Sequence, residues 1–383
     1  MKNFRVVLLT SIILGGGLLA QAAKDEPFTP ANPPAMKPLP DHNTPAYEAA
    51  KLFWHGVNLG DYLEAGRWGL KIKVDEFASM KREGFDHVRV PVSWHRYTGM
   101  APDFTLSEEI FSRVDFAVTN TLANRMSVMI NIHHFDALDA DPTNAAAEFL
   151  KIWQQIATHY KHYPPQLSFE LDNEPHDQAT TALMNPIYAQ AIAEIRKTNP
   201  HRTLFLEPGN WGSIHELKNL VLPPDDNLIV SVHCYEPFHF THQGAGWTTA
   251  DVQQTNIIFP GPPAHPLSMD ESLHLQPWVR DWIEKYNTLP ADKNPSGPSA
   301  FTGQLKYIHD WSAYYGRPVH LGEFGAYIKA DDYSRANYYA AFRQAADHEG
   351  IGWCIWDWSA NFHYWDNKNN APIPGMREAL FKK

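Results

Sequence analysis

Residues 167–175 have the sequence LSFELDNEP, in which a short apolar run, Leu167–Leu171, is followed by Asn173 and Glu174. An apolar run of this length that ends near a proline is typical of a buried β-strand. Similar runs elsewhere in the chain also end in a charged or hydrogen-bonding residue. The pattern predicts a sheet whose strands carry polar side chains at one end.

Eight segments are predicted to be strands. They are Trp54–Asn58, His87–Val90, Ser127–Ile132, Leu167–Leu171, Leu204–Leu206, Leu228–Val232, Val319–Leu321 and Trp353–Trp356. Segments with a helical spacing of apolar residues lie between several of them, for example Ile110–Leu122 and Phe149–Tyr160. Alternation of strand and helix is typical of a parallel sheet, and eight such units predict a closed (β/α)8 TIM barrel. A doubly wound open sheet would show the same alternation.

The polar residues at the strand ends favour the barrel over the open sheet. They are Arg89 on the second strand, His133 and His134 after the third, Asn173 and Glu174 after the fourth, His233 and Tyr235 after the sixth, Glu323 after the seventh and Trp356 on the eighth. In a closed barrel the carboxyl ends of the strands converge on one mouth, whereas in an open sheet they lie along an edge. We therefore predict a TIM barrel with these side chains around its mouth.

The chain has 383 residues, enough for one barrel of about 250 residues with long loops or for two ordinary domains. No convincing linker interrupts residues 46–383, so we expect one barrel domain there. The interval between the sixth and seventh predicted strands is rich in proline and too long for a plain crossover, which predicts a long loop insertion. This insertion is expected to form part of the cleft wall; the alternative is decoration away from the site.

Residues 1–22 have a basic start with Lys2 and Arg5, an apolar run up to Ala20 and small residues at its end. This pattern predicts a cleaved signal peptide and a secreted or periplasmic protein with no membrane segment after cleavage; the alternative is a retained N-terminal anchor. Residues 23–45 carry many prolines, which prevent helix and ladder hydrogen bonding. We expect this segment to be a disordered leader.

The formal net charge is −11 and the sequence pI is near 6.0. Phosphate backbones are bound by clustered Lys and Arg, which the chain lacks, so a nucleic-acid partner is not expected.

The chain contains two cysteines, Cys234 and Cys354, and export would place them where disulfides form. Because side chains alternate along a strand, Cys234 is expected on the face opposite His233, whereas Cys354 is expected on the same face as Trp356. The two cysteines would then point to opposite faces of the sheet, which argues against a disulfide between them. We therefore predict two buried free thiols.

Glu174 and Glu323 are two carboxylates at the predicted mouth, and such a pair suits glycoside hydrolysis. One carboxyl must protonate the departing oxygen, while the other attacks the sugar or activates water. The two roles need different protonation states at one pH: mutual repulsion raises one pKa, and a cation such as Arg89 keeps the other carboxyl ionised. Taken singly, a strand-end glutamate could equally form an ion pair or cap a helix.

Two other functions fit parts of the sequence. A metal-dependent barrel hydrolase is suggested by 20 histidines, including the adjacent His133 and His134. Such sites need His-x-His on the first strand or clustered ligands, and the first strand offers only His55. A non-catalytic carbohydrate-binding protein on the same fold would be expected to lack one of the two glutamates. We predict no metal and no other cofactor.

Five motifs resemble the signature series of glycoside hydrolase family 5, the cellulase family. They are Arg89–Trp94 (RVPVSW), Ile130–His134 (INIHH), Asp172–Pro175 (DNEP), His233–Tyr235 (HCY) and Gly322–Gly325 (GEFG). Asn-Glu-Pro alone is a weak motif, but five motifs in the right order at strand-length spacing are specific. The resemblance spans Phe53 to Trp358 and implies a barrel with catalytic glutamates on strands four and seven.

The resemblance implies a role for each matched residue. Glu174 matches the family's proton donor and Glu323 its nucleophile, and the reaction retains the anomeric configuration. The expected substrate-binding residues are Arg89, His133, His134, Asn173, Trp211, His233, Tyr235 and Trp356. Among these, Trp211 could equally be wedged between helices.

The segment Pro237–Trp247 resembles the loop of cellulase-type members of the family. We therefore expect a monomeric endo-β-1,4-glucanase that acts on β-glucan polysaccharides or oligosaccharides. Endo-β-1,4-mannanase activity is the alternative, because substrate selectivity within the resembled family lies in loops that one sequence does not place.

Overall fold

The computed structural model describes residues 27–382 except residues 33, 35, 41 and 66–68. The predicted signal peptide, residues 1–22, and the start of the leader lie outside the described residues. In the part of the chain that is described, no helix is both long enough and apolar enough to cross a membrane.

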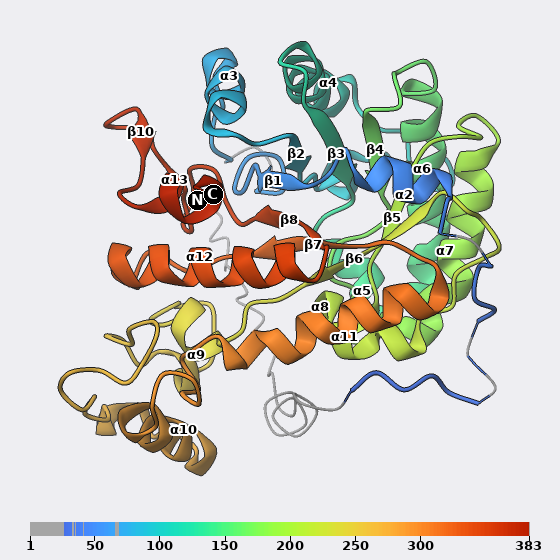
Figure 1. Ribbon diagram of the computed structural model, residues 1–383. Helices are drawn as coiled ribbons and strands as arrows, with labels where there is room; N and C mark the ends of the chain where they lie inside the picture. Colours follow the sequence, from blue (N-terminus) through green and yellow to red (C-terminus); the bar gives the residue numbers. More distant parts are fainter. Residues whose placement is uncertain (1–26, 33, 35, 41, 66–68, 383) are drawn as a thin grey trace, which may run out of the picture.

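Eight parallel strands close into a barrel at the centre of the structure (Figure 1). They are β1 (His55–Asn58), β2 (His87–Val90), β3 (Ser127–Asn131), β4 (Leu167–Glu170), β5 (Leu204–Leu206), β6 (Leu228–His233), β7 (Val319–Phe324) and β8 (Gly352–Ile355). Each strand pairs with the next in sequence, and β8 pairs with β1. The predicted TIM barrel is confirmed. The predicted strand ends differ most at β7, which continues to Phe324 and so contains Glu323.

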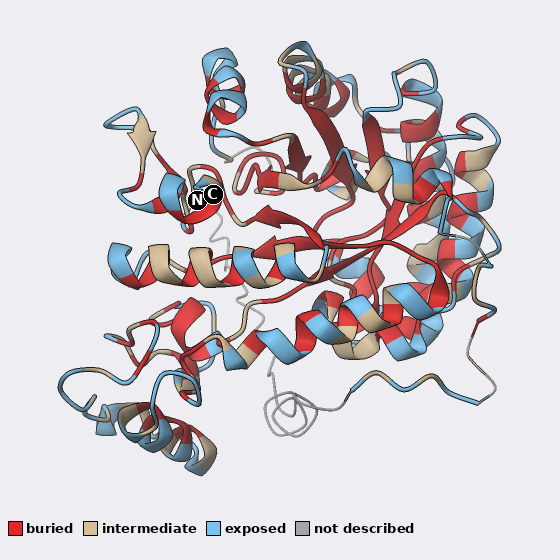
Figure 2. Ribbon diagram, in the orientation of Figure 1, coloured by how far each residue is buried: buried red, intermediate tan, exposed pale blue. Residues whose placement is uncertain are grey.

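Helices cover the outside of the barrel, and in Figure 2 their outer faces are exposed while the strands are buried. The longer helices are α3 (Val74–Glu83), α4 (Glu108–Ala123), α6 (Pro142–His159), α7 (Thr181–Arg196), α10 (Pro277–Thr288), α11 (Ser299–Tyr315) and α12 (Asp332–His348). Shorter elements are α2 (Pro45–Ala50), η2 (Trp94–Tyr97), α5 (Asp136–Ala140), α8 (Gly209–Gly212), η3 (Ile214–Asn219), α9 (Phe238–Thr241), η4 (Ala250–Val252), η5 (Glu271–Leu273), α13 (Met376–Phe381) and the hairpin β9 (Trp365–Asp366) and β10 (Ala371–Pro372).

Local sequence explains where a helix such as α6 begins and how it packs. The Asp141 side chain accepts a hydrogen bond from the Asn144 backbone N–H, and Pro142 occupies the first helical position, where no N–H is needed. Phe149 and Trp153 lie four residues apart, share one face of the helix and are buried. The apolar stripe of the helix therefore faces the barrel.

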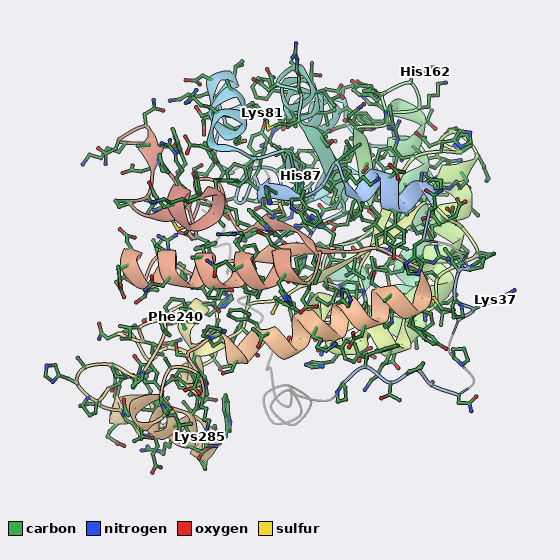
Figure 3. The ribbon with its side chains drawn as sticks, viewed as in Figure 1. Lys37, Lys81, His87, His162, Phe240 and Lys285 are labelled. Atoms are coloured by element: carbon green, nitrogen blue, oxygen red, sulfur yellow. The ribbon has the colours of Figure 1, made fainter. Side chains whose placement is uncertain are left out.

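The barrel interior is apolar at its N-terminal end and polar at its C-terminal end. The apolar end contains Phe53, Met129, Phe205 and Ile229. His87 lies in the middle of Figure 3 and is fully buried, whereas the labelled Lys81 and Lys285 lie at the periphery. Because side chains alternate along a strand, Arg89 faces the same interior one step nearer the C-terminal end.

Strand β7 is irregular where it carries Glu323. His320 faces the interior, where its ring packs against two other interior rings, so plain alternation would turn Glu323 away from it. The register of the β6–β7 pair shifts here, and consecutive residues of β6 pair with Leu321 and Glu323. This bulge leaves Gly322 as an extra residue in β7 and returns Glu323 to the interior.

The long interval between β6 and β7 carries α9, η4, η5 and α10 before α11 begins. Its α10 region projects beyond the barrel, at the lower left of Figure 1. Phe240, labelled in Figure 3, is buried in this segment and packs against Phe259 and Tyr338. The start of the segment lies at the barrel mouth, because the His242 ring packs edge-on against Tyr235.

The described part of the leader contains no helix or strand before α2 and contacts α11. The Phe28 ring lies 5.5 Å from that of Tyr307 and 5.7 Å from that of Tyr314. The Leu39 N–H donates to the Tyr315 carbonyl at 3.0 Å. These contacts attach the described part of the leader to α11. The disorder that we expect for residues 23–45 stays a prediction.

Cys234 and Cys354 are both buried thiols that form no disulfide, which confirms the prediction. Asn58 Nδ2 donates to Cys354 Sγ at 3.3 Å inside the barrel. Cys234 Sγ instead contacts Gln304 Oε1 of α11 at 3.8 Å on the outside of the barrel.

Candidate active site

Arg89 of β2 is the hub of a buried polar network at the C-terminal end of the barrel. All five of its N–H groups meet an acceptor. Nε donates to Glu170 Oε2 at 2.7 Å. Nη1 donates to Asn58 Oδ1 at 2.9 Å and to Glu323 Oε1 at 2.7 Å. Nη2 donates to Asn173 Oδ1 at 2.7 Å and to Glu207 Oε1 at 3.3 Å. Burial lowers the pKa of Arg89, but the three carboxylates raise it above its ordinary value. The guanidinium therefore stays charged and holds side chains from several strands in place.

Glu174 and Glu323 meet across the barrel mouth, where a carboxylate oxygen of one lies within 4.8 Å of a carboxylate oxygen of the other. Glu323 Oε1 accepts from Arg89, and its Oε2 accepts from the Tyr235 hydroxyl at 2.8 Å. Glu174 follows β4 and has a left-handed backbone, with φ of 49°. Its Oε1 lies 2.7 Å from His233 Nδ1. The two carboxyls are therefore close together but have different partners.

His233 at the end of β6 lies among three carboxylates. Its Nδ1 lies 2.7 Å from Glu174 Oε1 and 3.7 Å from Glu323 Oε2, and its Nε2 lies 3.0 Å from Glu207 Oε1. Burial lowers the pKa of His233, but the three carboxylates outweigh burial and raise it well above its ordinary value. The imidazole is therefore a second cation of the site, beside Arg89.

The two glutamates differ in the directions of their pKa shifts. Burial raises the pKa of Glu323, with the charge of Glu174 adding to it and His233 and Arg89 opposing it. Burial also raises the pKa of Glu174, but His233, together with His134 and Arg89, outweighs burial, so the pKa lies below its ordinary value. We expected repulsion to raise the pKa of one glutamate and Arg89 to keep its neighbour ionised. Instead the pKa of Glu323, beside Arg89, is raised and that of Glu174 is lowered, because His233 lies 2.7 Å from Glu174 and the two share a proton.

His133, His134 and Trp356 form an aromatic group beside the two glutamates. The His133 ring stacks with that of Trp356 at 5.8 Å and 8°, and it meets the His134 ring edge-on at 4.2 Å. Burial, with the neighbouring His134 and Arg89, holds the pKa of His133 well below its ordinary value. A neutral imidazole and an indole are suited to contact the face and the hydroxyls of a sugar.

Trp211 lies in the short α8 after β5 and contacts the segment that carries Glu174. Its ring stacks on His176 at 3.6 Å and 16°, its backbone N–H donates to the Pro175 carbonyl at 3.2 Å, and 41% of the residue is exposed. His176 Nδ1 in turn lies 2.8 Å from the Glu174 carbonyl. The expected alternative, a tryptophan wedged between helices, does not describe this exposed position.

Within the described residues, one group of side chains has the spacing of metal ligands: Glu174, His233 and Glu323. These atoms already bind one another, Arg89 and Tyr235. The guanidinium lies 2.7 Å from Glu323 and would repel a cation bound there. The arrangement therefore suits proton transfer better than metal binding.

Residues 47–362 match the cellulase family, glycosyl hydrolase family 5. The chain belongs to this family. Among its relatives, Endoglucanase H of Acetivibrio thermocellus is 29% identical over 315 residues, which cover 81% of this chain and 30% of the relative. Endoglucanase 3 of Fibrobacter succinogenes is 29% identical over 374 residues, covering 92% and 55%. The chain thus spans only about a third to a half of these curated relatives.

Solved structures of family 5 cover the fold more completely. Cel5A of Thermotoga maritima in complex with cellobiose is 31% identical, has a TM-score of 0.75 and matches 88% of this chain and 100% of its own. The same protein in complex with mannotriose is 31% identical, with a TM-score of 0.74 and the same coverage.

Three residues of this family 5 site are absent from the sequence-based prediction: Asn58, Glu170 and Glu207. All are fully buried and contact Arg89. Asn58 and Glu207 show the same signal that identified the others, because each is a polar residue at the end of a predicted strand. Glu170 lies inside an apolar run and gave no such signal.

Proposed function

We propose that this chain is a retaining endo-β-1,4-glucanase, with Glu174 as proton donor and Glu323 as nucleophile. The observation that carries the proposal is the pair of buried carboxylates, with oxygens within 4.8 Å of each other and with different partners. Retaining glycosidases place their two carboxyl groups about 5–5.5 Å apart, whereas inverting enzymes leave about 6.5–9.5 Å for a water molecule.

In the first step, a Glu323 oxygen attacks the anomeric carbon while the bond to the leaving oxygen breaks and Glu174 gives that oxygen a proton. In the second step, Glu174 takes a proton from water, the water oxygen attacks the same carbon and the bond to Glu323 breaks. Arg89 and Tyr235 hold Glu323 in place for the attack. Asn173 is held through its Oδ1 by Arg89, so its amide N–H groups remain to meet the sugar 2-OH.

The substrate proposal is supported by the endoglucanase relatives and by the cellobiose complex of a similar structure. The mannotriose complex of that same protein supports β-1,4-mannan as a second substrate. Both polymers carry equatorial β-1,4 links, so one cleft can accept either backbone.

A panel of polysaccharides tests this proposal. Reducing ends released from carboxymethylcellulose, mixed-linkage glucan, glucomannan, galactomannan, xyloglucan and laminarin would be measured, with Glu323→Gln as the inactive control. We expect the first three to be cleaved. Activity confined to galactomannan would make the chain a mannanase, and little activity on the first three would overturn the glucanase proposal.

We also propose that the protein is exported and acts as a monomer. The basic, apolar and small-residue pattern of residues 1–22 supports export. The proton donor, the nucleophile and their partners His233, Arg89 and Tyr235 all lie on this chain, so the proposed reaction needs no residue from a second copy. Cell fractionation and light scattering would check the two statements separately.

The variant Tyr235→Phe should lose activity mainly at low pH. It removes the hydroxyl that donates to Glu323 Oε2, so the pKa of Glu323 rises further and the acid limb of kcat/KM moves to higher pH. A hydrogen bond to a charged group contributes about 1.5–3 kcal/mol, so kcat/KM should fall by about ten- to a hundredfold. Tyr327→Phe, which changes a ring packed on Trp247, is the matched control. An unchanged acid limb in Tyr235→Phe would contradict this assignment.

The variant Trp211→Ala should weaken binding of the leaving portion of the substrate. Trp211 contacts the segment of the proposed proton donor, and the leaving sugar must lie on that side. An aromatic stack contributes about 1 kcal/mol, so KM for cellopentaose should rise about fivefold. KM for an aryl β-cellobioside, which has no leaving sugar, should stay the same; an equal rise for both would place Trp211 elsewhere in the cleft.

A further inference from the structure

Glu207, the residue after β5, makes two kinds of contact with the machinery around Glu174. It is fully buried. Its Oε2 accepts from the Glu174 backbone N–H at 2.8 Å, and its Oε1 lies 3.0 Å from His233 Nε2. The second contact has ion-pair distance but not hydrogen-bond geometry. One carboxylate thus touches both the backbone of Glu174 and the imidazole that faces the Glu174 side chain.

The backbone contact fixes a conformation that glutamate does not favour. Glu174 has a φ of 49°, in the left-handed region where a side chain other than glycine is strained. A carboxylate that accepts the N–H of this residue makes a charge-assisted hydrogen bond, which compensates the strain. The Glu207 carboxylate has room because residue 212 is glycine: a Cβ there would lie 2.8 Å from Oε2.

The contact of Glu207 with His233 affects the proton that His233 shares with Glu174. Nδ1 of His233 and Oε1 of Glu174 are 2.7 Å apart, and one proton between them can reside on either atom with the same net charge. The two groups therefore titrate together. Burial raises the pKa of Glu207 to about 7. In its charged form this carboxylate lies 3.0 Å from the far side of the imidazole and stabilises the shared proton, and burial strengthens the interaction.

Other charged and titratable groups also face this pair. Around Glu207 and His233 lie Arg89 on β2, His133 after β3, Glu170 on β4, Asp172 and Glu174 after β4, Tyr188 on α7, Tyr235 after β6, and His320 and Glu323 on β7. Glu207 itself lies 3.0 Å from His233 Nε2, the ring nitrogen that faces away from Glu174.

We propose that Glu207 is a positioning residue for the proton donor: it holds the Glu174 backbone and, through His233, keeps the donor's proton in the site. The inference rests on the proposed glycosidase function. Glu207 would then be a third carboxylate of the site. It does not contact the sugar, but it sets the upper pH limit at which Glu174 can act as an acid.

The variants Glu207→Gln and Glu207→Asp separate the two effects. The glutamine keeps the length and an oxygen for the Glu174 N–H but loses the charge. The basic limb of kcat/KM should therefore move to lower pH, because the His233–Glu174 pair loses its shared proton more easily. The aspartate keeps the charge but is shorter, so it should keep the basic limb and lose rate through misplacement of Glu174.

Two substrates show whether the loss concerns proton donation. A cellotetraoside with a poor sugar leaving group needs the proton, whereas 2,4-dinitrophenyl β-cellobioside does not. General acid catalysis contributes about 10²–10⁴ in rate, and Glu207→Gln keeps Glu174 in place but leaves it without its proton over more of the pH range. Its kcat/KM should therefore fall by about ten- to a hundredfold on the first substrate. It should stay within about threefold on the second, because an activated leaving group needs little acid catalysis.

The matched control is Glu83→Gln. Glu83 is a buried carboxylate of α3 that accepts from Tyr364 and Arg377 and not from Arg89, so its variant should leave the basic limb at the wild-type pH. A wild-type basic limb in Glu207→Gln, or an equal loss on both substrates, would overturn the inference. If circular dichroism shows that Glu207→Gln is unfolded, a shifted basic limb in Glu207→Asp would overturn it instead. Failure of the wild-type protein on both substrates would count against the proposed function, and is thus a distinct result.

Discussion

Replacing Glu323 by alanine should abolish turnover, with a fall in kcat on the order of 10⁶, as expected when a covalent catalyst loses its nucleophile. The Glu323 carboxylate is held by Arg89 Nη1 and the Tyr235 hydroxyl, and no other described carboxylate has this pair of donors. Initial rates on 2,4-dinitrophenyl β-cellobioside would measure the loss, since its reactive leaving group makes residual activity detectable.

Sodium azide should restore part of this activity and identify the role of Glu323. In Glu323→Ala, azide can occupy the space of the carboxylate and attack the anomeric carbon directly, so the product should be the α-glycosyl azide. Glu323→Gln keeps the shape and should not be rescued. A β-glycosyl azide from the alanine variant, or release of the α anomer first by the wild-type protein in NMR, would contradict the nucleophile assignment.

Replacing Glu174 by glutamine should cost on the order of 10²–10⁴ in kcat/KM on substrates with poor leaving groups, the usual contribution of a general acid. The amide has no proton to give at this position. Activated aryl cellobiosides should retain most of their first-step rate, so the ratio between the two substrate classes measures the donor role. The basic limb of the pH profile should disappear on the activated substrate.

Azide should act differently on this variant. It should attack the glycosyl-enzyme that Glu323 has formed, so the product should be the β-glycosyl azide, the opposite anomer to that from Glu323→Ala. The matched control is Glu83→Gln, a buried carboxylate that accepts from Tyr364 and Arg377 and not from Arg89. Near-normal activity of Glu174→Gln on cellotetraose would remove Glu174 from its role.

Much of the fold followed from local sequence. The eight mainly apolar runs with polar ends correspond to β1–β8, because a strand buried on both faces needs mostly apolar side chains and ends where the chain must turn. The free thiols also followed, since side chains alternate regularly along β8. Glu207 gave the same strand-end signal but has no place in the resembled motifs, so its contact with Glu174 emerged only from the structure.

The sequence by itself determined the barrel and identified the two glutamates, because strand length, the alternation of strands with helices and the residues at strand ends are local properties. Only the tertiary structure decided how the glutamates face each other. Plain alternation would turn Glu323 out of the barrel, and the bulge at Gly322 returns it to the interior. Glu174 needs a left-handed backbone held by a carboxylate 33 residues further along the chain. Both depend on contacts between strands, which a single run of residues does not encode.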